Sequence, residues 1–192
     1  MRGGDLRLWL RQETGALHDR LDDGMSRLDL STRAGLETFL ISHVYGLRAV
    51  LGIARRFAFQ SLHIPMPDYL AMAQADLDAL GAAAPDLTAD PELNREAHAT
   101  DGAGECYVIL GSRMGMSVLR QQGYWRGGDF RHSRYMDDAE EKQAWGALLD
   151  WLGARQDDPA LNASVLTGAQ RAFAAFEQGL NLAQREQGIF TP

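Results

Sequence analysis

Apolar side chains recur every three or four residues along most of the chain, which is the spacing of one face of an α-helix. Leu6, Leu10, Leu17 and Leu21 form one such stripe and predict a first helix over about residues 5–23. No stretch alternates for long between apolar and polar residues, and β-branched residues are sparse. The pattern therefore favours helices and gives almost no sign of strands.

A second, longer helix is predicted to begin at the Ser31-Thr32 pair, because hydroxyl side chains often cap a helix start. Pro65 and Pro67 interrupt the chain, and a third helix is predicted over residues 67–81. The buried face of the second helix is predicted to hold Phe39, Leu40, Val44, Leu47, Leu51 and Ala54. That of the third is predicted to hold Leu70, Ala73, Leu77 and Leu80.

The second half of the chain is also predicted to be helical. A turn-rich connector over residues 82–94 leads into a helix predicted over about 94–122. Glycines and scattered charges predict a loop over 123–137. Two amphipathic helices follow, at 139–155 and 159–186. We see no internal repeat and no low-complexity segment, so the sequence predicts an all-α protein.

Composition narrows the class of protein. With 192 residues, of which 45% are hydrophobic, the chain is expected to form one domain over 1–192 with a core from about 6 to 187. The net charge of −7 argues against a nucleic-acid partner, because such proteins present a dense basic face. Early charges at the N-terminus argue against a signal peptide, and no apolar run approaches a membrane span. We expect a cytoplasmic protein without a membrane partner.

Two glycines stand four residues apart inside one predicted helix, in the stretch GECYVILGSRMGMSVLR. Each glycine costs about 1 kcal/mol relative to alanine in a helix interior. Gly111 and Gly115 share a face and leave a flat strip of backbone there. Either another helix or a planar ligand could approach this strip closely, and the glycine spacing alone does not decide between them.

A histidine lies beside the leucine stripe of the first helix. His18 is expected to be partly covered, and its ring could simply bond Asp22 at i+4. An imidazole at the margin of a core can also bind a metal with one nitrogen while a neighbour holds the other. A histidine facing a helix without side chains is the arrangement that would sandwich a haem.

Four stretches of the chain resemble the haem oxygenase family. LRQETGALHDRLD is similar to the family's proximal L-R-x-x-T-x-x-x-H-x-x-L helix, and YVILGSRMG to its distal Y-V-x-x-G-S-x-x-G helix. YLAMAQADLDALG and AQRAFAAFEQGL resemble an intervening segment and the final helix. The resemblance covers about residues 6–182 and looks closest to the bacterial branch found beside bacteriophytochromes. It implies a single-domain helical bundle with haem between the proximal and distal helices.

The resemblance also implies roles for individual residues. His18 would be the proximal iron ligand, and Gly111 and Gly115 would press bare backbone on the porphyrin. Ser112 would support the distal water network. Tyr107 matches a tyrosine that reaches a haem propionate.

Lys142, the only lysine of the chain, lies in a stretch similar to one that also meets the propionates. Without the resemblance it would be interpreted as a solvated helix charge. The chain departs from the family at Ala144, where relatives often carry arginine before a tryptophan. We expect other arginines to substitute for it: Arg113, Arg120 or Arg126.

A second departure is Met116, where many relatives have a small residue. Its thioether would crowd or ligate the iron if it points at the haem, and would be core otherwise. The implied activity is oxidative cleavage of haem to biliverdin, Fe²⁺ and CO with O₂ and electrons from an external reductase or ferredoxin. A bacteriophytochrome is the expected receiver of biliverdin. The alternative, favoured by Met116 and Ala144, is a non-catalytic haem- or bilin-binding sensor or partner protein.

Weaker patterns point elsewhere. A thiaminase-like protein of related architecture would use Cys106, the only cysteine, but no histidine stands at a spacing that would activate it. A metal site at His132, Asp137 and Asp138 lacks the helical spacing of known motifs. His43 is expected to be a satisfied histidine at the edge of the core.

Overall fold

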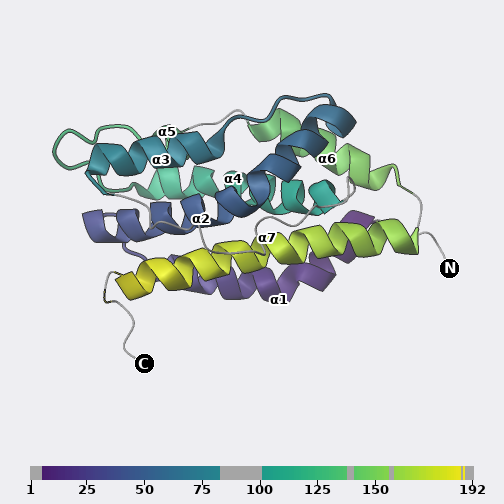
Figure 1. Ribbon diagram of the computed structural model, residues 1–192, viewed down its shortest axis with the longest axis horizontal. Coiled ribbons are helices and arrows are strands. Elements are labelled where there is room, and N and C mark those ends of the chain that lie inside the picture. Colours follow the sequence, from purple (N-terminus) through teal and green to yellow (C-terminus); the bar gives the residue numbers. More distant parts are fainter. Residues whose placement is uncertain (1–5, 83–100, 138–140, 156–157, 187, 189–192) are drawn as a thin grey trace.

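The computed structural model describes residues 6–82, 101–137, 141–155, 158–186 and 188 (Figure 1). These residues form helices and no strand, which confirms the all-α prediction. The helices are α1 (Leu6–Ser26), α2 (Arg33–Phe57), η1 (Ala58–Leu62), α3 (Tyr69–Leu80), α4 (Asp101–Gln122), α5 (Arg134–Asp137), α6 (Glu141–Gly153) and α7 (Pro159–Glu186).

The long helix α7 organises the bundle. It packs along α2, α4 and α1, and in Figure 1 it runs side by side with α1 at the lower edge of the molecule. Helix α3 covers the other side of α2, and α6 packs on α4. Because α1 packs mainly on α7, it leaves most of its length along α4 without direct contact.

Helix α2 forms the centre of the core. It begins as the sequence predicts: Thr32 is the N-cap, and its hydroxyl accepts a hydrogen bond from the Gly35 N–H at 3.1 Å. All six residues predicted for its inner face are buried. The segment Arg33–Leu62 is long and apolar enough to cross a membrane by composition, but 72% of the tested window is buried inside the domain.

Close approach of helices depends on glycines that the sequence analysis did not single out. A Cβ at Gly104 of α4 would collide with the Val165 carbonyl of α7. A Cβ at Gly179 of α7 would lie 2.6 Å from the Ser42 carbonyl oxygen of α2. The α4–α7 and α2–α7 contacts therefore need these positions to lack a side chain.

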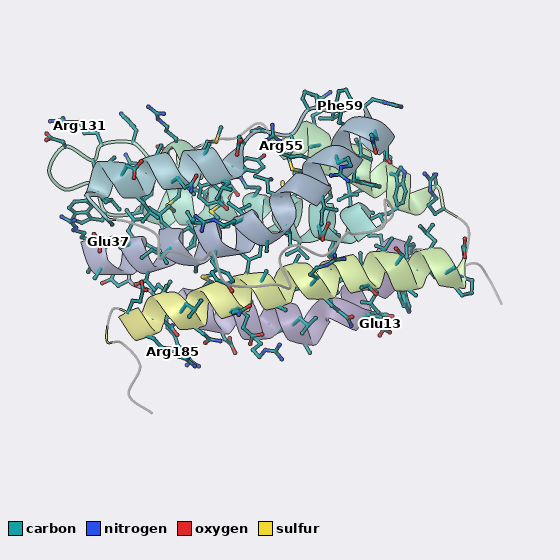
Figure 2. The ribbon with its side chains drawn as sticks, viewed as in Figure 1. Glu13, Glu37, Arg55, Phe59, Arg131 and Arg185 are labelled. Carbon is teal, nitrogen blue, oxygen red and sulfur yellow. The ribbon has the colours of Figure 1, made fainter. Side chains whose placement is uncertain are left out.

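The structure differs from the predicted elements in two places. Helix α2 continues into the π-helical turn η1, which ends at His63 with a φ of 56°. The segment 123–137, predicted as a loop, contains the short helix α5. Most of the predicted connector, residues 83–94, lies outside the described residues, as do residues 95–100 of the predicted fourth helix. Charged side chains such as Glu13, Arg131 and Arg185 project from the outside of the bundle (Figure 2).

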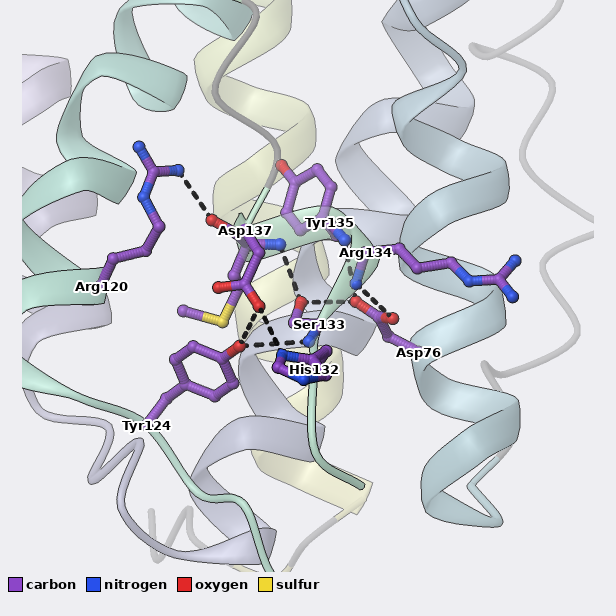
Figure 3. A network of polar contacts seen from close by, with 9 residues as sticks. Asp76, Arg120, Tyr124, His132, Ser133, Arg134, Tyr135 and Asp137 are labelled. Atoms are coloured by element: carbon purple, nitrogen blue, oxygen red, sulfur yellow. Dashed lines mark hydrogen bonds and ion pairs between the residues drawn. The ribbon is translucent and has the colours of Figure 1, made fainter. Parts of the chain in front are cut away.

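A buried carboxylate attaches the start of α5 to α3. Asp76 of α3 is 2% exposed, and its oxygens accept hydrogen bonds from the Ser133 hydroxyl at 2.5 Å and the Arg134 and Tyr135 N–H groups at 2.9 and 3.0 Å (Figure 3). The Ser133 hydroxyl oxygen in turn accepts the Met136 N–H at 2.7 Å. The carboxylate thus satisfies buried donors that no helix ladder serves.

We expect Asp76→Ala to lower the free energy of unfolding by about 3 kcal/mol, because it leaves a buried hydroxyl and two N–H groups without their acceptor. Urea unfolding followed by circular dichroism measures the loss. Asp78→Ala, which removes an exposed carboxylate from the same helix, is the matched control. Equal midpoints for the two variants would contradict the assigned role of Asp76.

Candidate functional site: a cavity between α1 and α4

A cavity of about 1130 Å³ separates α1 from α4. Both helices contribute to its walls, together with parts of α2 and α7, Trp145 of α6 and the 28–31 segment. Small-molecule sites commonly occupy about 300–1,000 Å³, so this space is large enough for a bulky ligand. His18, Gly111 and Gly115, which the sequence analysis placed on opposite sides of a ligand, all line it.

His18 presents its ring to the cavity and retains a carboxylate neighbour. Its Nδ1 lies 3.4 Å from an Asp22 oxygen and 3.8 Å from an Asp19 oxygen. The side chain is 59% exposed, and Phe173 of α7 approaches the ring at 6.2 Å between centroids. The two sequence interpretations are compatible: Asp22 engages one nitrogen, and the ring still borders the cavity.

Gly111 and Gly115 of α4 face this space and not another helix. A Cβ at Gly115 would meet no atom within 4 Å, and one at Gly111 would come only to ordinary contact with Trp145, at 3.8 Å. The alternative of close helix packing is therefore wrong for this pair. On the α1 side, Gly15 also lines the cavity and has open space at its Cβ position. Bare backbone thus borders the cavity from both sides.

Three further predicted residues of α4 line the cavity: Tyr107, Ser112 and Met116. The Ser112 hydroxyl donates to the Ile109 carbonyl at 2.8 Å, which leaves its oxygen lone pairs as acceptors. Burial raises the pKa of Tyr107, and nearby Arg11 and Arg7 partly offset this. Met116 is only 2% exposed and still borders the cavity, so its thioether lies at the wall of the site.

The expected contact of Arg113 with a propionate is contradicted by its position. Arg113 is fully buried, and its guanidinium lies 4.7 Å from the ring centroids of both Tyr69 and Tyr135. Its Nη1 donates to the Tyr135 carbonyl at 2.6 Å. Because this side chain spans the contact between α4 and α3–α5, it does not line the cavity.

The other expected basic contacts also lie elsewhere. Arg120 donates to the Met136 carbonyl at 2.8 Å, and Arg126 lies over the Tyr124 ring at 4.7 Å. Lys142 is exposed on α6 and is not part of the cavity lining. Its neighbour Ala144 is buried. The prediction that Lys142 reaches a ligand in the cavity is corrected accordingly: the structure shows it as a solvated charge.

Arg7 and Arg11 of α1 supply the positive charge that the sequence analysis sought on α4 and α6. Both line the cavity near Tyr107, and both lower its pKa. Helical spacing could have identified Arg11, since it stands seven residues before His18 and therefore on the same face.

His43 was predicted to be a satisfied core-edge histidine, and the structure adds that it also lines the cavity. The ring is 4% exposed, and its Nδ1 lies 2.8 Å from the Phe39 carbonyl oxygen. Burial lowers its pKa to about 4; the Phe39 carbonyl opposes this shift, and the positive Arg113 adds to it. His43 is therefore a neutral imidazole in the wall, with Nδ1 as the bonded donor.

The depressed pKa of His43 predicts a pH-dependent stability. The unfolded chain takes up a proton near pH 6.5 and the folded chain near pH 4, so the contribution is complete above pH 6.5 and is lost as the pH falls toward 4. At 1.36 kcal/mol per pKa unit, the loss amounts to about 3 kcal/mol. Urea unfolding at pH 7 and pH 4.5 measures it. We expect a smaller pH dependence in His43→Phe, and equal pH dependence in both proteins would contradict the assignment.

The weaker candidates gain no support from their surroundings. Cys106 is fully buried, its thiol donates to the Ala54 carbonyl, and burial raises its pKa, so it does not resemble a reactive nucleophile. His132 lies 3.9 Å from an Asp137 oxygen, and Asp138 is outside the described residues. Among the described residues there is no group of three or more His, Cys, Asp or Glu side chains that could hold a metal ion.

Comparison with known proteins supports the fold. The chain is similar to the crystal structure of the NO- and CO-bound haem oxygenase from Neisseria meningitidis, with a TM-score of 0.71 and 19% sequence identity. The match covers 96% of this chain and 92% of the other. No protein-family model matches the sequence, and no curated protein matches it. The bundle therefore has the haem oxygenase fold.

Proposed function

We propose that this chain binds haem in the cavity between α1 and α4 and cleaves it oxidatively to biliverdin, Fe²⁺ and CO. One observation carries the proposal: His18 borders the cavity from α1, while Gly111 and Gly115 border it from α4 with open space at their Cβ positions. His18 would bind the central metal of a planar macrocycle, and the lack of side chains at Gly111 and Gly115 would let the macrocycle approach the α4 backbone closely.

The residues present fit such a group. His18 would bind the iron, with its second nitrogen held by the Asp22 carboxylate 3.4 Å away, which fixes the orientation of the ring. Arg7, Arg11 and Tyr107 would bind the two propionates, because guanidinium groups pair well with carboxylates. These residues replace Lys142 and Arg113 in that role.

Bound haem supplies the redox chemistry, activating O₂ with electrons from a donor protein. The chain's own contribution is geometric and polar. Apolar side chains such as Phe173 and Phe176 exclude bulk water from the α7 side of the cavity. The Ser112 oxygen and the neutral His43 ring offer fixed polar positions for ordered water. The bare backbone at Gly111 and Gly115 would let a flat ligand lie close to α4, because no side chain intervenes.

The proposal is tested by adding ferric haem to the purified chain and then ascorbate or a ferredoxin–reductase pair in air. We expect a shifted Soret band, followed by its decay and the rise of a biliverdin band, with CO released stoichiometrically. A wild-type protein that binds haem but forms no bilin under adequate reduction would remove the enzymatic claim. A protein that does not shift the Soret band would remove haem binding as well.

Met116 favours a second candidate function, a haem-binding sensor or partner protein without turnover. Its thioether is buried at the cavity wall, on the residue that directly follows Gly115. A thioether that ligated the iron would compete with O₂ for the metal. A six-coordinate low-spin spectrum in the wild type, converted by Met116→Ala to a five-coordinate one that turns over, would support this alternative.

The expected partners follow from the proposed reaction. A ferredoxin or reductase would supply electrons, and a bacteriophytochrome would receive biliverdin, both in the cytoplasm. Co-purification with a bacteriophytochrome that becomes loaded with chromophore tests the second partner.

The basic end of the cavity gives a further prediction. We expect Arg11→Gln to weaken haem binding about tenfold, because one paired donor to a propionate is lost at a solvent-accessible rim. Titration of ferric haem followed at the Soret band measures the affinity. Arg48→Gln, at an exposed position of α2 outside the cavity, is the control. Equal affinities for the two variants would place the propionates elsewhere.

A further inference from the structure

The charge of the α1 wall of the cavity changes sign along the helix. Arg7 and Arg11 precede His18, and Asp19 and Asp22 follow it, and all five side chains line the cavity. With a rise of 1.5 Å per residue, Arg11 lies about 10 Å before His18 along the helix axis, and Asp22 about 6 Å after it. A ligand centred over His18 therefore has positive charge at one edge and negative charge at the other.

The other walls repeat this polarity. Near the arginines, α4 contributes Tyr107, whose pKa the arginines lower against the effect of burial. At the opposite end, the 28–31 segment contributes Asp29, whose carboxylate accepts hydrogen bonds from the Ser31 hydroxyl at 2.5 Å and the Ser31 N–H at 3.0 Å. These bonds lower the pKa of Asp29 and keep it ionised at neutral pH. We call Arg7, Arg11 and Tyr107 the basic end of the cavity, and Asp19, Asp22 and Asp29 its acidic end.

We propose that the acidic end determines the orientation of the bound macrocycle in its plane, by repelling the two propionates so that they can occupy only the basic end. The inference rests on the proposed function, since it requires haem in the cavity. It goes further by giving a second role to Asp22, which also neighbours His18, and a role to Asp19 and Asp29, which the proposed function leaves without one. Attraction at one end lowers the energy of one orientation, and repulsion at the other raises the energy of its competitors.

This arrangement has a consequence for the product. If the bound macrocycle rotated in its plane, a different meso carbon would lie next to a given part of α4. A single orientation therefore presents one meso carbon to the backbone at Gly111 and Gly115, and cleavage gives one biliverdin isomer. Because the acidic side chains are exposed, their repulsion is screened by salt, and the selectivity should be greatest at low ionic strength.

The test compares three charge reversals on the full chain: Asp22→Lys and Asp29→Lys at the acidic end, and Asp23→Lys as the control. Asp23 is exposed, follows Asp22 directly and does not line the cavity. The probe is the ferric haem complex with cyanide, in which the heme-methyl proton resonances report each in-plane orientation separately. Circular dichroism and the Soret band show that each variant is folded and loaded.

We expect one set of methyl resonances, apart from the pair due to the two faces of haem, in the wild type and in Asp23→Lys. In Asp22→Lys or Asp29→Lys, the population of a rotated orientation should rise about tenfold, since a repulsive contact becomes attractive. Biliverdin isomers separated by chromatography should change in parallel. Unchanged resonances in both acidic-end variants, or several orientations in the wild type, would overturn the inference while leaving haem binding intact. A wild type that bound no haem would overturn the proposed function itself.

Discussion

Replacing His18 by alanine is expected to weaken the binding of ferric haem at least about a hundredfold and to abolish bilin formation. Loss of residues that merely orient a ligand typically costs 10–100-fold in metal affinity, so loss of the ligand itself should cost at least the upper part of that range. The fold should persist, because the side chain is 59% exposed and contributes little to the core. Soret titration and circular dichroism measure the two effects separately.

Exogenous imidazole sharpens this test. The cavity remains open in His18→Ala, so imidazole can enter and restore a five-coordinate spectrum if position 18 is the axial site. His63→Ala, at an exposed position outside the cavity lining, is the control and should bind haem as the wild type does. Unimpaired binding by His18→Ala, or an equal loss in His63→Ala, would contradict the assignment of His18.

The helices were predictable because their signals are local. Leucine spacing gave α1, the Thr32 cap gave the start of α2, and the residues named for the inner face of α2 are buried. The helix α5 could not be predicted in the same way. Its first N–H groups bond Asp76, which lies 57 residues earlier than Ser133 in the chain, and no local pattern contains such a pair.

The candidate site could also be predicted only in part. Residues on one face of one helix could be grouped from the sequence, and His18, Gly111 and Gly115 do line one cavity. Their catalytic roles stay predictions. The sequence does not show which basic residues reach the cavity, because the direction of a long side chain depends on its partners in the fold. Arg113 is drawn between two tyrosine rings by contacts with α3 and α5 that the sequence does not show, and Lys142 remains in solvent.

The glycines of α4 give the second large prediction, because they fall into two kinds that only the structure separates. Gly115→Leu is expected to abolish haem binding and turnover while changing the midpoint of unfolding little, since its side chain would enter open space in the cavity. The substitution even removes the entropic cost of a helical glycine, about 1 kcal/mol. Soret titration should therefore show that haem binding is lost, and urea unfolding should show that stability is retained.

Gly104→Ala is the matched contrast on the same helix. Its Cβ would strike the Val165 carbonyl, which belongs to the backbone of α7 and cannot rotate away. We expect a loss of about 3 kcal/mol in the free energy of unfolding, as overpacking between helices commonly costs 1–3 kcal/mol or more. The fraction that remains folded should still bind haem. If Gly115→Leu destabilised the protein as much as Gly104→Ala and still bound haem, then Gly115 would serve packing and not a ligand. If instead Gly115→Leu stayed stable and lost haem binding while Gly104→Ala was destabilised, the two glycines would have separate roles. Gly104 would allow close packing on α7, and Gly115 would leave room for a flat ligand on another face of α4.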